Sequence, residues 1–284
     1  MKCAWKELLA IVPAWLRPQL NPFSGQAQDI RLRLGAPPEV TTGEGSIFLT
    51  GDVTAEELTF VVNAASRYSP WAAATMAQGY LTAPGGHRIG ICGEAVIRQG
   101  RMEGIRHINS LCIRVARDFP GVGKDLAELE GSILILGAPG WGKTTLLRDL
   151  IRQKSCHGRH ISVVDERGEL FPPGTERGSL TEVLTGCPKA RGIEMLLRTM
   201  GPQIIAVDEI TAREDCDALR QAAWCGVDLI ATAHAGSLRD YLHREVYKPL
   251  VQDNLFDHLV ILQPDRHWRL ERSGAWTSSG SVRY

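Results

Sequence analysis

Residues 132–147 read SILILGAPGWGKTTLL, and this stretch decides the fold. Ser132–Leu136 form a mostly apolar run between two glycines, as expected of a strand buried on both faces of a parallel sheet. A glycine-rich loop follows directly, and the residues from Lys143 to about 154 favour a helix. A buried strand, a loop and a helix in direct succession predict one repeating unit of an α/β domain.

The same alternation continues toward the C-terminus and predicts a doubly wound, mostly parallel sheet. Further strands are expected at 161–164, 204–207 and 229–232, with helices at about 143–154, 190–200, 214–224 and 238–252. Segments 259–262 and 268–271 are expected to extend this sheet as a hairpin.

The N-terminal part of the chain has a different pattern, in which short strands alternate with turn residues. Asp29–Leu34 has the period-two pattern of a half-buried strand, and residues 87–97 indicate a strand pair or one bent strand. Thr54 and Glu57 form a capping-box pattern for the helix that follows. These features predict a smaller α+β domain.

Domain boundaries follow from these patterns. We expect an N-terminal α+β domain with its linker at 1–122, the larger α/β domain at 123–272 and a mobile tail at 273–284. The linker is placed at Pro120–Gly123, where proline and glycine cluster, and the tail is rich in serine and glycine.

The composition is that of a soluble protein. The 284 residues include 32 basic and 32 acidic side chains, so no global field draws the chain to nucleic acid or to an anionic membrane. Seven scattered cysteines without a CxxC pair indicate reduced thiols in a cytosolic protein. No apolar run reaches the roughly 20 residues of a membrane-spanning helix, so any membrane role requires a partner.

The loop Gly137–Thr144 has the pattern GxxxxGKT, which predicts a phosphate-binding loop for a nucleotide. Backbone N–H groups and the N-terminus of the following helix can surround phosphate oxygens there. Lys143 is expected to reach the β- and γ-phosphates, and Thr144 to ligate Mg²⁺. Trp141 either stacks on the nucleotide or covers the loop. The predicted nucleotide-binding residues are Gly137, Ala138, Pro139, Gly140, Trp141, Gly142, Lys143, Thr144 and Thr145.

Asp208 and Glu209 directly follow the apolar segment 204–207. Carboxylates at the carboxyl end of a strand beside such a loop form a Walker B arrangement. Asp208 is therefore predicted to hold Mg²⁺, and Glu209 to activate the attacking water. The glutamate favours hydrolysis over nucleotide binding alone, so the predicted activity is ATP hydrolysis with ATP and Mg²⁺ bound.

Further polar residues are expected at the same edge of the sheet, because ligands of doubly wound folds bind at the carboxyl ends of the strands. Asp165 and Glu166 follow one predicted strand; Glu166 is a candidate catalytic residue, and solvated loop acids are the alternative. Asp165 and Gly168 also fit the DxxG element of GTPases, but no NKxD segment follows, so ATP is preferred. His234 follows another predicted strand and is a candidate γ-phosphate sensor.

Several arginines gather before the predicted linker. One or two of them can supply an arginine finger to a nucleotide on a neighbouring domain or subunit, and the simpler interpretation is a solvated basic face. These residues are Arg88, Arg98, Arg101, Arg106, Arg114 and Arg117.

Taken together, these features resemble the type II/type IV secretion ATPase superfamily, and most closely the stage III sporulation protein AA family. The segments that carry the resemblance are Ile30–Glu39, Gly79–Val96, Ser110–Arg117, Gly137–Leu150, Val163–Leu170, Val207–Ile210 and Thr232–Ala235. They extend over most of the chain between about residues 25 and 240, so the combination is more specific than the phosphate-binding loop alone.

The resemblance implies a RecA-like ATPase core with a smaller N-terminal domain, assembled as a hexameric ring with nucleotide between subunits. It also implies a cytoplasmic, mother-cell ATPase that is peripheral to a membrane complex and docks on the membrane proteins of a sporulation channel. In this plan Asp165 and Glu166 resemble the Asp box, and His234 the His box. Many secretion ATPases carry Gly-Glu where this chain has Asp208-Glu209, which leaves open which carboxylate activates water.

Three functional classes are consistent with these patterns. The first hypothesis is an ATPase that hydrolyses ATP at subunit interfaces to energise a membrane channel or secretion-like complex during sporulation. The alternative is a RecA-like ATPase acting on single-stranded nucleic acid through the stretch Arg98–Arg117, which the neutral net charge disfavours. The third is a nucleotide-binding scaffold without turnover, which Glu209 disfavours.

Overall fold

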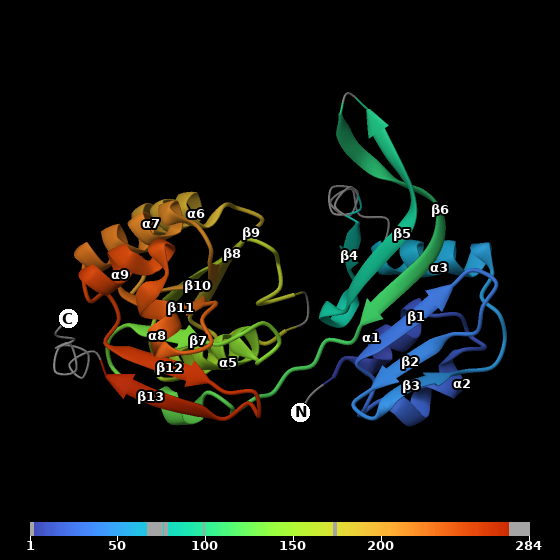
Figure 1. Cartoon of the computed structure of the whole chain (residues 1–284), viewed down its shortest axis with the longest axis horizontal. Helices are drawn as coiled ribbons and strands as arrows, with labels where there is room; N and C mark the ends of the chain where they lie inside the picture. Colours follow the sequence, from blue (N-terminus) through green and yellow to red (C-terminus); the bar gives the residue numbers. More distant parts are fainter. Residues whose placement is uncertain (1–2, 67–75, 77–78, 99, 173–174, 273–284) are drawn as a thin grey trace. The chain divides into compact units, whose positions relative to one another are not determined.

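The computed structural model describes residues 3–66, 76, 79–98, 100–172 and 175–272. These residues form two compact units (Figure 1): one comprises the chain up to Asp118 with Pro172 and Thr175, and the other comprises Phe119–Phe171 and the described residues from Glu176 on. The predicted tail at 273–284 lies outside the described residues. Within the described ranges, no helix combines the length and apolar character that crossing a bilayer requires.

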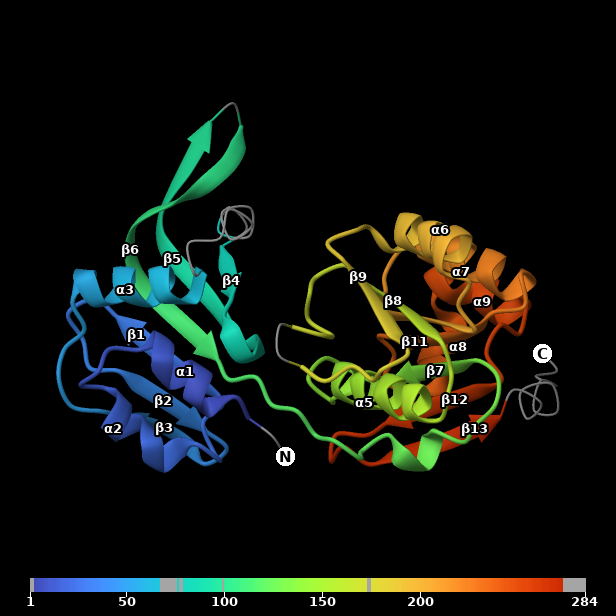
Figure 2. The ribbon, with the colours of Figure 1, turned by 180° about the vertical axis from the view of Figure 1, so that it is seen from behind.

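The first unit is a six-stranded antiparallel sheet in the order β3-β2-β1-β6-β5-β4, with helices on one face (Figure 2). Its strands are β1 (Asp29–Arg33), β2 (Glu39–Thr42), β3 (Gly45–Phe48), β4 (Tyr80–Thr82), β5 (Arg88–Arg98) and β6 (Arg101–Arg114). Its helices are α1 (Trp5–Ile11), α2 (Arg17–Leu20) and α3 (Ala55–Ser66), with short 3₁₀ turns η1 (Asn21–Phe23) and η2 (Pro84–Gly86).

Alternating burial explains why one face of this sheet carries the helices. In β1, Ile30 and Leu32 are fully buried, whereas the charged residues between them are partly exposed on the other face. Helix α3 begins with the predicted capping box: the Glu57 N–H donates to the Thr54 hydroxyl at 3.2 Å, and the Thr54 N–H donates to the Glu57 carboxylate at 2.9 Å. The strand and the helix start predicted here are confirmed.

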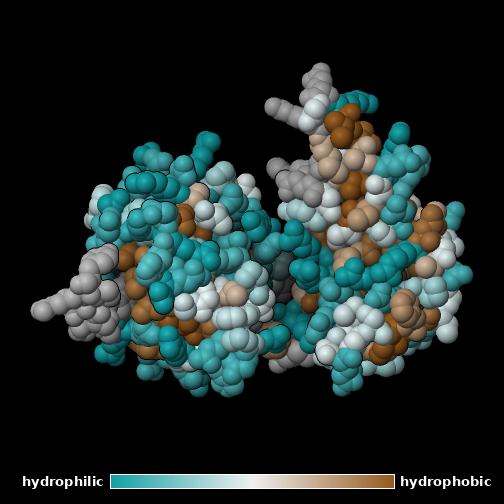
Figure 3. Space-filling model, viewed as in Figure 1, coloured by the Kyte–Doolittle hydropathy of each residue, from teal (hydrophilic) through white to brown (hydrophobic). Residues whose placement is uncertain are grey.

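Residues 87–97 contribute one bent strand, β5, which pairs with β6 rather than with itself. A Cβ atom at Gly93 would lie 2.7 Å from the Arg106 carbonyl oxygen, so glycine permits the close approach at the bend. Beyond the bend the two strands continue as a ribbon on which apolar side chains gather (Figure 3), and Ile97 is 65% exposed. Strand β6 was not predicted, because its first part lies in the largely exposed ribbon without alternation, and only Leu111 and Ile113 near its end alternate into the core.

The second unit is a seven-stranded sheet in the order β13-β12-β7-β11-β10-β8-β9, in which all neighbours are parallel except β12 and β13. Its strands are β7 (Ile133–Leu136), β8 (Ile161–Asp165), β9 (Thr181–Thr185), β10 (Ile204–Ile210), β11 (Asp228–Ala233), β12 (His258–Leu262) and β13 (Trp268–Arg272). Its main helices are α5 (Lys143–Cys156), α6 (Lys189–Met200) and α7 (Arg213–Trp224), with a short turn η3 (Lys124–Leu126).

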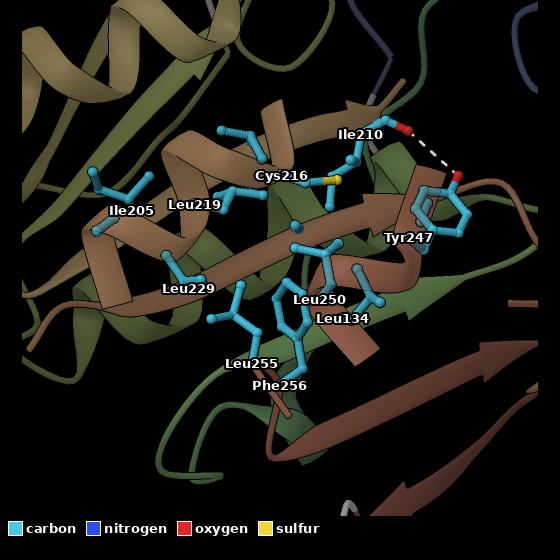
Figure 4. Close-up of a cluster of buried hydrophobic side chains, with 14 of the residues drawn as sticks. Leu134, Ile205, Ile210, Cys216, Leu219, Leu229, Tyr247, Leu250, Leu255 and Phe256 are labelled. Atoms are coloured by element: carbon cyan, nitrogen blue, oxygen red, sulfur yellow. Dashed lines mark hydrogen bonds between the residues drawn. The ribbon is translucent and has the colours of Figure 1, made fainter. Parts of the chain in front are cut away.

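Successive residues of β7 enter two different hydrophobic cores. Leu134 and Leu136 belong to the core under α6 and α7 (Figure 4), whereas Ile133 and Ile135 belong to the core under α5. A central strand with helices packed on both faces must be apolar at every position, which is why β7 reads as a continuous apolar run. The predicted fold class, a doubly wound and mostly parallel sheet with a smaller α+β domain, is confirmed.

Two details of this unit differ from the prediction. The helix expected at 238–252 is broken into α8 (Leu238–His243), a 3₁₀ turn η4 (Glu245–Tyr247) and α9 (Lys248–Gln252). Arg244 has extended backbone angles that end α8, and Tyr247 enters the core, where its hydroxyl donates to the Ile210 carbonyl oxygen at 3.3 Å (Figure 4). Strand β9 was also missed; it lies at the edge of the sheet, where a less apolar strand is tolerated.

The segment expected to be a linker is held against α5. The Gly121 and Gly123 N–H groups donate to the Asp149 carboxylate at 2.9 and 2.8 Å, and Asp149 forms a buried ion pair with Arg152. A Cβ atom at Gly123 would lie 2.8 Å from the Leu150 nitrogen. Glycine is needed here because the backbone lies directly against α5.

Candidate functional site

The loop between β7 and α5 has the backbone that anion binding requires. Gly140 and Gly142 have φ values of +79° and +98°, in the left-handed region that glycine adopts without strain. Gly142 precedes α5 and supplies no side-chain cap, so the N–H groups of the first turn are not capped by the residue before the helix. Such a helix start favours a phosphate group through its N–H donors and its partial positive charge.

Lys143 is the cationic side chain inside this loop. Lys143 is buried, and its ammonium donates to the Ala138 carbonyl oxygen at 3.1 Å. Burial lowers the pKa of Lys143, while the charges of Asp208 and Glu209 oppose that shift. Trp141 packs on the core under α5, which supports its covering role rather than an exposed stacking position.

A continuous chain of hydrogen bonds connects α5 with β10 and β11. The Thr144 hydroxyl donates to Asp208 Oδ2 at 2.7 Å, and the Thr232 hydroxyl donates to Asp208 Oδ1 at 2.6 Å. The Glu209 N–H in turn donates to the Thr232 hydroxyl at 2.8 Å. Thr232 is fully buried, so this chain holds both carboxylate residues against the neighbouring strand.

The Thr144 hydroxyl and the Asp208 carboxylate supply the hard oxygen donors that Mg²⁺ prefers. Among the described residues, no group of three His, Cys, Asp or Glu side chains is arranged to hold a metal ion alone. A Mg²⁺ ion that takes few protein ligands and completes its shell with phosphate oxygens and water fits this donor set. These two residues are the predicted metal ligands.

Glu209 has an unusual backbone conformation, and an arginine and a histidine lie close to its carboxylate. The predicted strand at 204–207 continues to Ile210, and a bulge at Asp208 and Glu209 gives Glu209 a φ of +56°. A non-glycine residue rarely takes this conformation unless its surroundings impose it. Its carboxylate lies 3.1 Å from Arg167 Nη1 and 3.7 Å from His234 Nε2.

His234, at the end of β11, therefore lies where the sequence predicted, beside the Walker B candidates. Burial, and after it the charge of Lys143, lower the pKa of His234, while Glu209 and Asp208 oppose this shift. Its backbone N–H donates to the Tyr247 hydroxyl at 3.2 Å. The imidazole of His234 thus lies beside Glu209, while the backbone of the same residue is tied to the core through Tyr247.

Asp165 and Glu166 have different surroundings, although they are adjacent in the sequence. The buried Asp165 carboxylate accepts the N–H groups of Glu169, Leu170 and Phe171 at 2.9 to 3.1 Å. Burial raises the pKa of Asp165, and these three hydrogen bonds oppose the shift. Asp165 thus organises its own loop, whereas Glu166 lies 2.5 Å from Lys189 Nζ.

One pocket brings the strand-end residues together. Its wall is formed by Asp165, Glu166, Arg167, Glu169, Lys189, Asp208 and Glu209. Sequence reasoning did not single out Arg167, Lys189 or Thr232. Arg167 and Thr232 lie inside segments that were recognised, but no local pattern marks Lys189, whose role depends on where α6 begins.

The arginines of the first unit are mostly engaged within it. Arg98, Arg106 and Arg114 lie 3.4, 3.1 and 3.6 Å from the carboxylates of Glu103, Glu94 and Asp29, respectively. Arg117 donates to the Ala27 carbonyl oxygen at 2.6 Å, and Arg88 lies over the Tyr80 ring at 4.2 Å. The side chain of Arg101 is not among those that the structure describes. The other five arginines therefore each have a partner within the first unit, although Arg98, Arg106 and Arg114 remain largely exposed.

Thr232→Val is expected to lower nucleotide turnover about 10- to 100-fold, the usual effect of losing an outer partner of a metal ligand. Valine keeps the shape of threonine but removes the donor to Asp208 and the acceptor for the Glu209 N–H. Steady-state phosphate release measures the effect. Thr232→Ser, which keeps the hydroxyl, is the matched control and should remain close to wild type. Equal turnover of the valine variant and the wild type would contradict the positioning role of Thr232.

Two solved structures share this fold. The Legionella pneumophila ATPase DotB is similar with a TM-score of 0.58 and 20% identity, covering 92% of this chain and 80% of that one. The pilus retraction motor PilT, solved with bound ADP, is similar with a TM-score of 0.63 and 15% identity, covering 91% of this chain and 81% of that one. These likenesses establish the class of fold.

The chain belongs to the sporulation stage III protein AA family. The family described as "Sporulation stage III, protein AA" matches residues 7–277. Stage III sporulation protein AA of Bacillus subtilis (strain 168) is 33% identical over 276 residues, covering 90% of this chain and 90% of that protein. The family expected from the sequence is confirmed.

Proposed function

We propose that this chain hydrolyses ATP to ADP and phosphate. The observation that carries the proposal is the hydrogen-bonded chain from Thr144 through Asp208 and Thr232 to Glu209, which places oxygen donors for a metal and a second carboxylate beside the phosphate-binding loop. Bound Mg²⁺ would neutralise charge on the phosphate oxygens. Thr144 and Asp208 would hold it.

Each remaining residue of the site has a proposed role. Lys143 binds the β- and γ-phosphates, in exchange for its present hydrogen bond to the Ala138 carbonyl. Glu209 accepts a proton from the attacking water, and Glu166 supplies a second carboxylate in the same pocket. His234 senses the γ-phosphate through its position beside Glu209.

We further propose that ATP binds at the interfaces of a homo-oligomeric, hexameric ring. Membership of a sporulation family and a fold shared with DotB and PilT support this proposal. The ring would work in the mother-cell cytoplasm on membrane proteins of a channel or secretion-like complex. ATP hydrolysis at each interface would be converted into movement of that complex.

Sedimentation of the purified chain tests the ring. With Mg²⁺ and a slowly hydrolysed ATP analogue, we expect a species of six chains that dissociates when the nucleotide is removed, because nucleotide would bridge neighbouring subunits. The same run without Mg²⁺ is the control. A chain that remains monomeric with Mg²⁺ and the analogue contradicts the ring, while phosphate release by the same preparation with Mg²⁺ and ATP would leave the ATPase proposal standing.

A further inference from the structure

Lys189 is a buried lysine at the first position of α6. Its side chain is only 8% exposed, and its ammonium lies 2.5 Å from Glu166 Oε2 and 3.7 Å from Asp215 Oδ2. An ammonium group loses most of its hydration in such a position, so it must be compensated by nearby carboxylates. The two carboxylates come from different parts of the chain, the loop after β8 and the start of α7.

The two carboxylates are held to different degrees. Asp215 is buried and accepts the N–H groups of Thr211 and Ala212 at 3.0 and 3.1 Å, which fixes it at the turn after β10. The Glu166 side chain is 38% exposed, and the ion pair with Lys189 is its only polar contact within the described residues. Lys189 therefore ties an otherwise loosely held carboxylate to a fixed point.

The charges of the pocket explain why Glu166 needs this contact. Glu166 shares the pocket with four other acidic residues, Asp165, Glu169, Asp208 and Glu209. The lining contains two cations, of which Arg167 lies against Glu209. Repulsion among the carboxylates would turn Glu166 toward solvent if Lys189 were absent, because little else opposes the movement.

We propose that Lys189 is a positioning residue, which keeps the Glu166 carboxylate inside the pocket that contains Asp208 and Glu209. The inference rests on the proposed ATPase function, because it assigns Lys189 to the geometry of that site. It also links the position of Glu166 to the start of α7 through Asp215. A movement of β10 and α7 during turnover would thereby reach the Glu166 loop.

Lys189→Met tests this role, since methionine has a similar length and no charge. We expect kcat to fall about 10- to 100-fold, as for other outer-shell partners, with the KM for ATP nearly unchanged because the phosphate-binding loop is intact. Lys248→Met is the matched control: Lys248 also lies 2.5 Å from a glutamate, Glu245, but on the surface and outside the pocket. It should turn over ATP like the wild type.

A double-mutant cycle separates positioning from a general structural effect. If Lys189 acts through Glu166, Lys189→Met should change kcat by less than about 2-fold once Glu166 is already glutamine. If Lys189 had a merely structural role, Lys189→Met would lower kcat by the same factor in the Glu166→Gln variant as in the wild type. That result, or a Lys189→Met variant with wild-type kcat, overturns the inference.

Folding of the variants is checked by thermal melting and by binding of a fluorescent ADP analogue. If Lys189→Met shows no cooperative melting transition, Lys189→Gln takes its place in the double-mutant cycle. Glutamine keeps hydrogen-bond donors but has no charge. A wild-type chain without turnover would refute the proposed function and the inference together. An active wild type with an unaffected Lys189 variant would refute the inference alone.

Discussion

Replacing Lys143 with alanine is expected to abolish ATP turnover and to weaken nucleotide binding. The Lys143 ammonium is a buried cation in the predicted phosphate-binding loop, where it donates to the Ala138 carbonyl oxygen. Alanine would leave the phosphates facing the Asp208 and Glu209 carboxylates, whose charges already act on Lys143. Loss of one such stabilising group costs about 10²- to 10³-fold in kcat, so turnover should fall by at least about 100-fold.

Phosphate release and titration with a fluorescent ATP analogue measure the two effects of Lys143→Ala separately. Lys248→Ala removes an exposed lysine outside the loop and serves as the control. Both variants should melt close to the wild-type temperature. Wild-type turnover in Lys143→Ala would show that Gly137–Thr144 is not the phosphate-binding loop of an ATPase.

Replacing Glu209 with glutamine should keep nucleotide binding and remove turnover. Glutamine has the same shape, can still contact Arg167 and His234, and leaves the backbone hydrogen bond to Thr232 in place. It cannot accept a proton from water. Loss of a general base lowers the rate by about 10²- to 10⁴-fold, and single-turnover phosphate release would measure this fall.

The control for Glu209→Gln is Glu214→Gln, which changes an exposed glutamate in the first turn of α7. Glu166→Gln, measured beside it, decides which carboxylate activates water. If Glu209→Gln hydrolyses ATP normally and Glu166→Gln does not, the role of base passes to Glu166. If both hydrolyse ATP normally, the carboxylate pocket is not the catalytic site.

Local sequence was sufficient for the parts of the site that form within one strand–loop–helix unit. The loop Gly137–Thr144 adopts its conformation because Gly140 and Gly142 tolerate positive φ and because a buried strand and a helix flank it. The capping box of Thr54 and Glu57 likewise depends only on residues that are close in the sequence. Both predictions depend on contacts within about eight residues, which a sequence pattern records directly.

Predictions failed where neighbouring elements competed with local preference. The apolar spacing at 238–252 favours one helix, but Arg244 is extended and Tyr247 turns into the core to reach Ile210. The part of β6 that lies in the ribbon carries no alternation, because it is largely exposed on both faces. For Tyr247 the decisive contact, with Ile210, joins residues far apart in the sequence.

The sequence by itself indicated the family, through its resemblance over several segments. It also determined the parallel sheet, the loop and helix start that carry Thr144, and the strand ends that carry Asp208 and His234, because apolar periodicity and glycine position are local properties. Only the tertiary structure decided how those ends are connected. Thr232 bridges Asp208 and Glu209, and Lys189 holds Glu166, because parallel strands bring their carboxyl ends to one edge of the sheet. Which side chains meet there depends on the bulge in β10 and on where α6 begins.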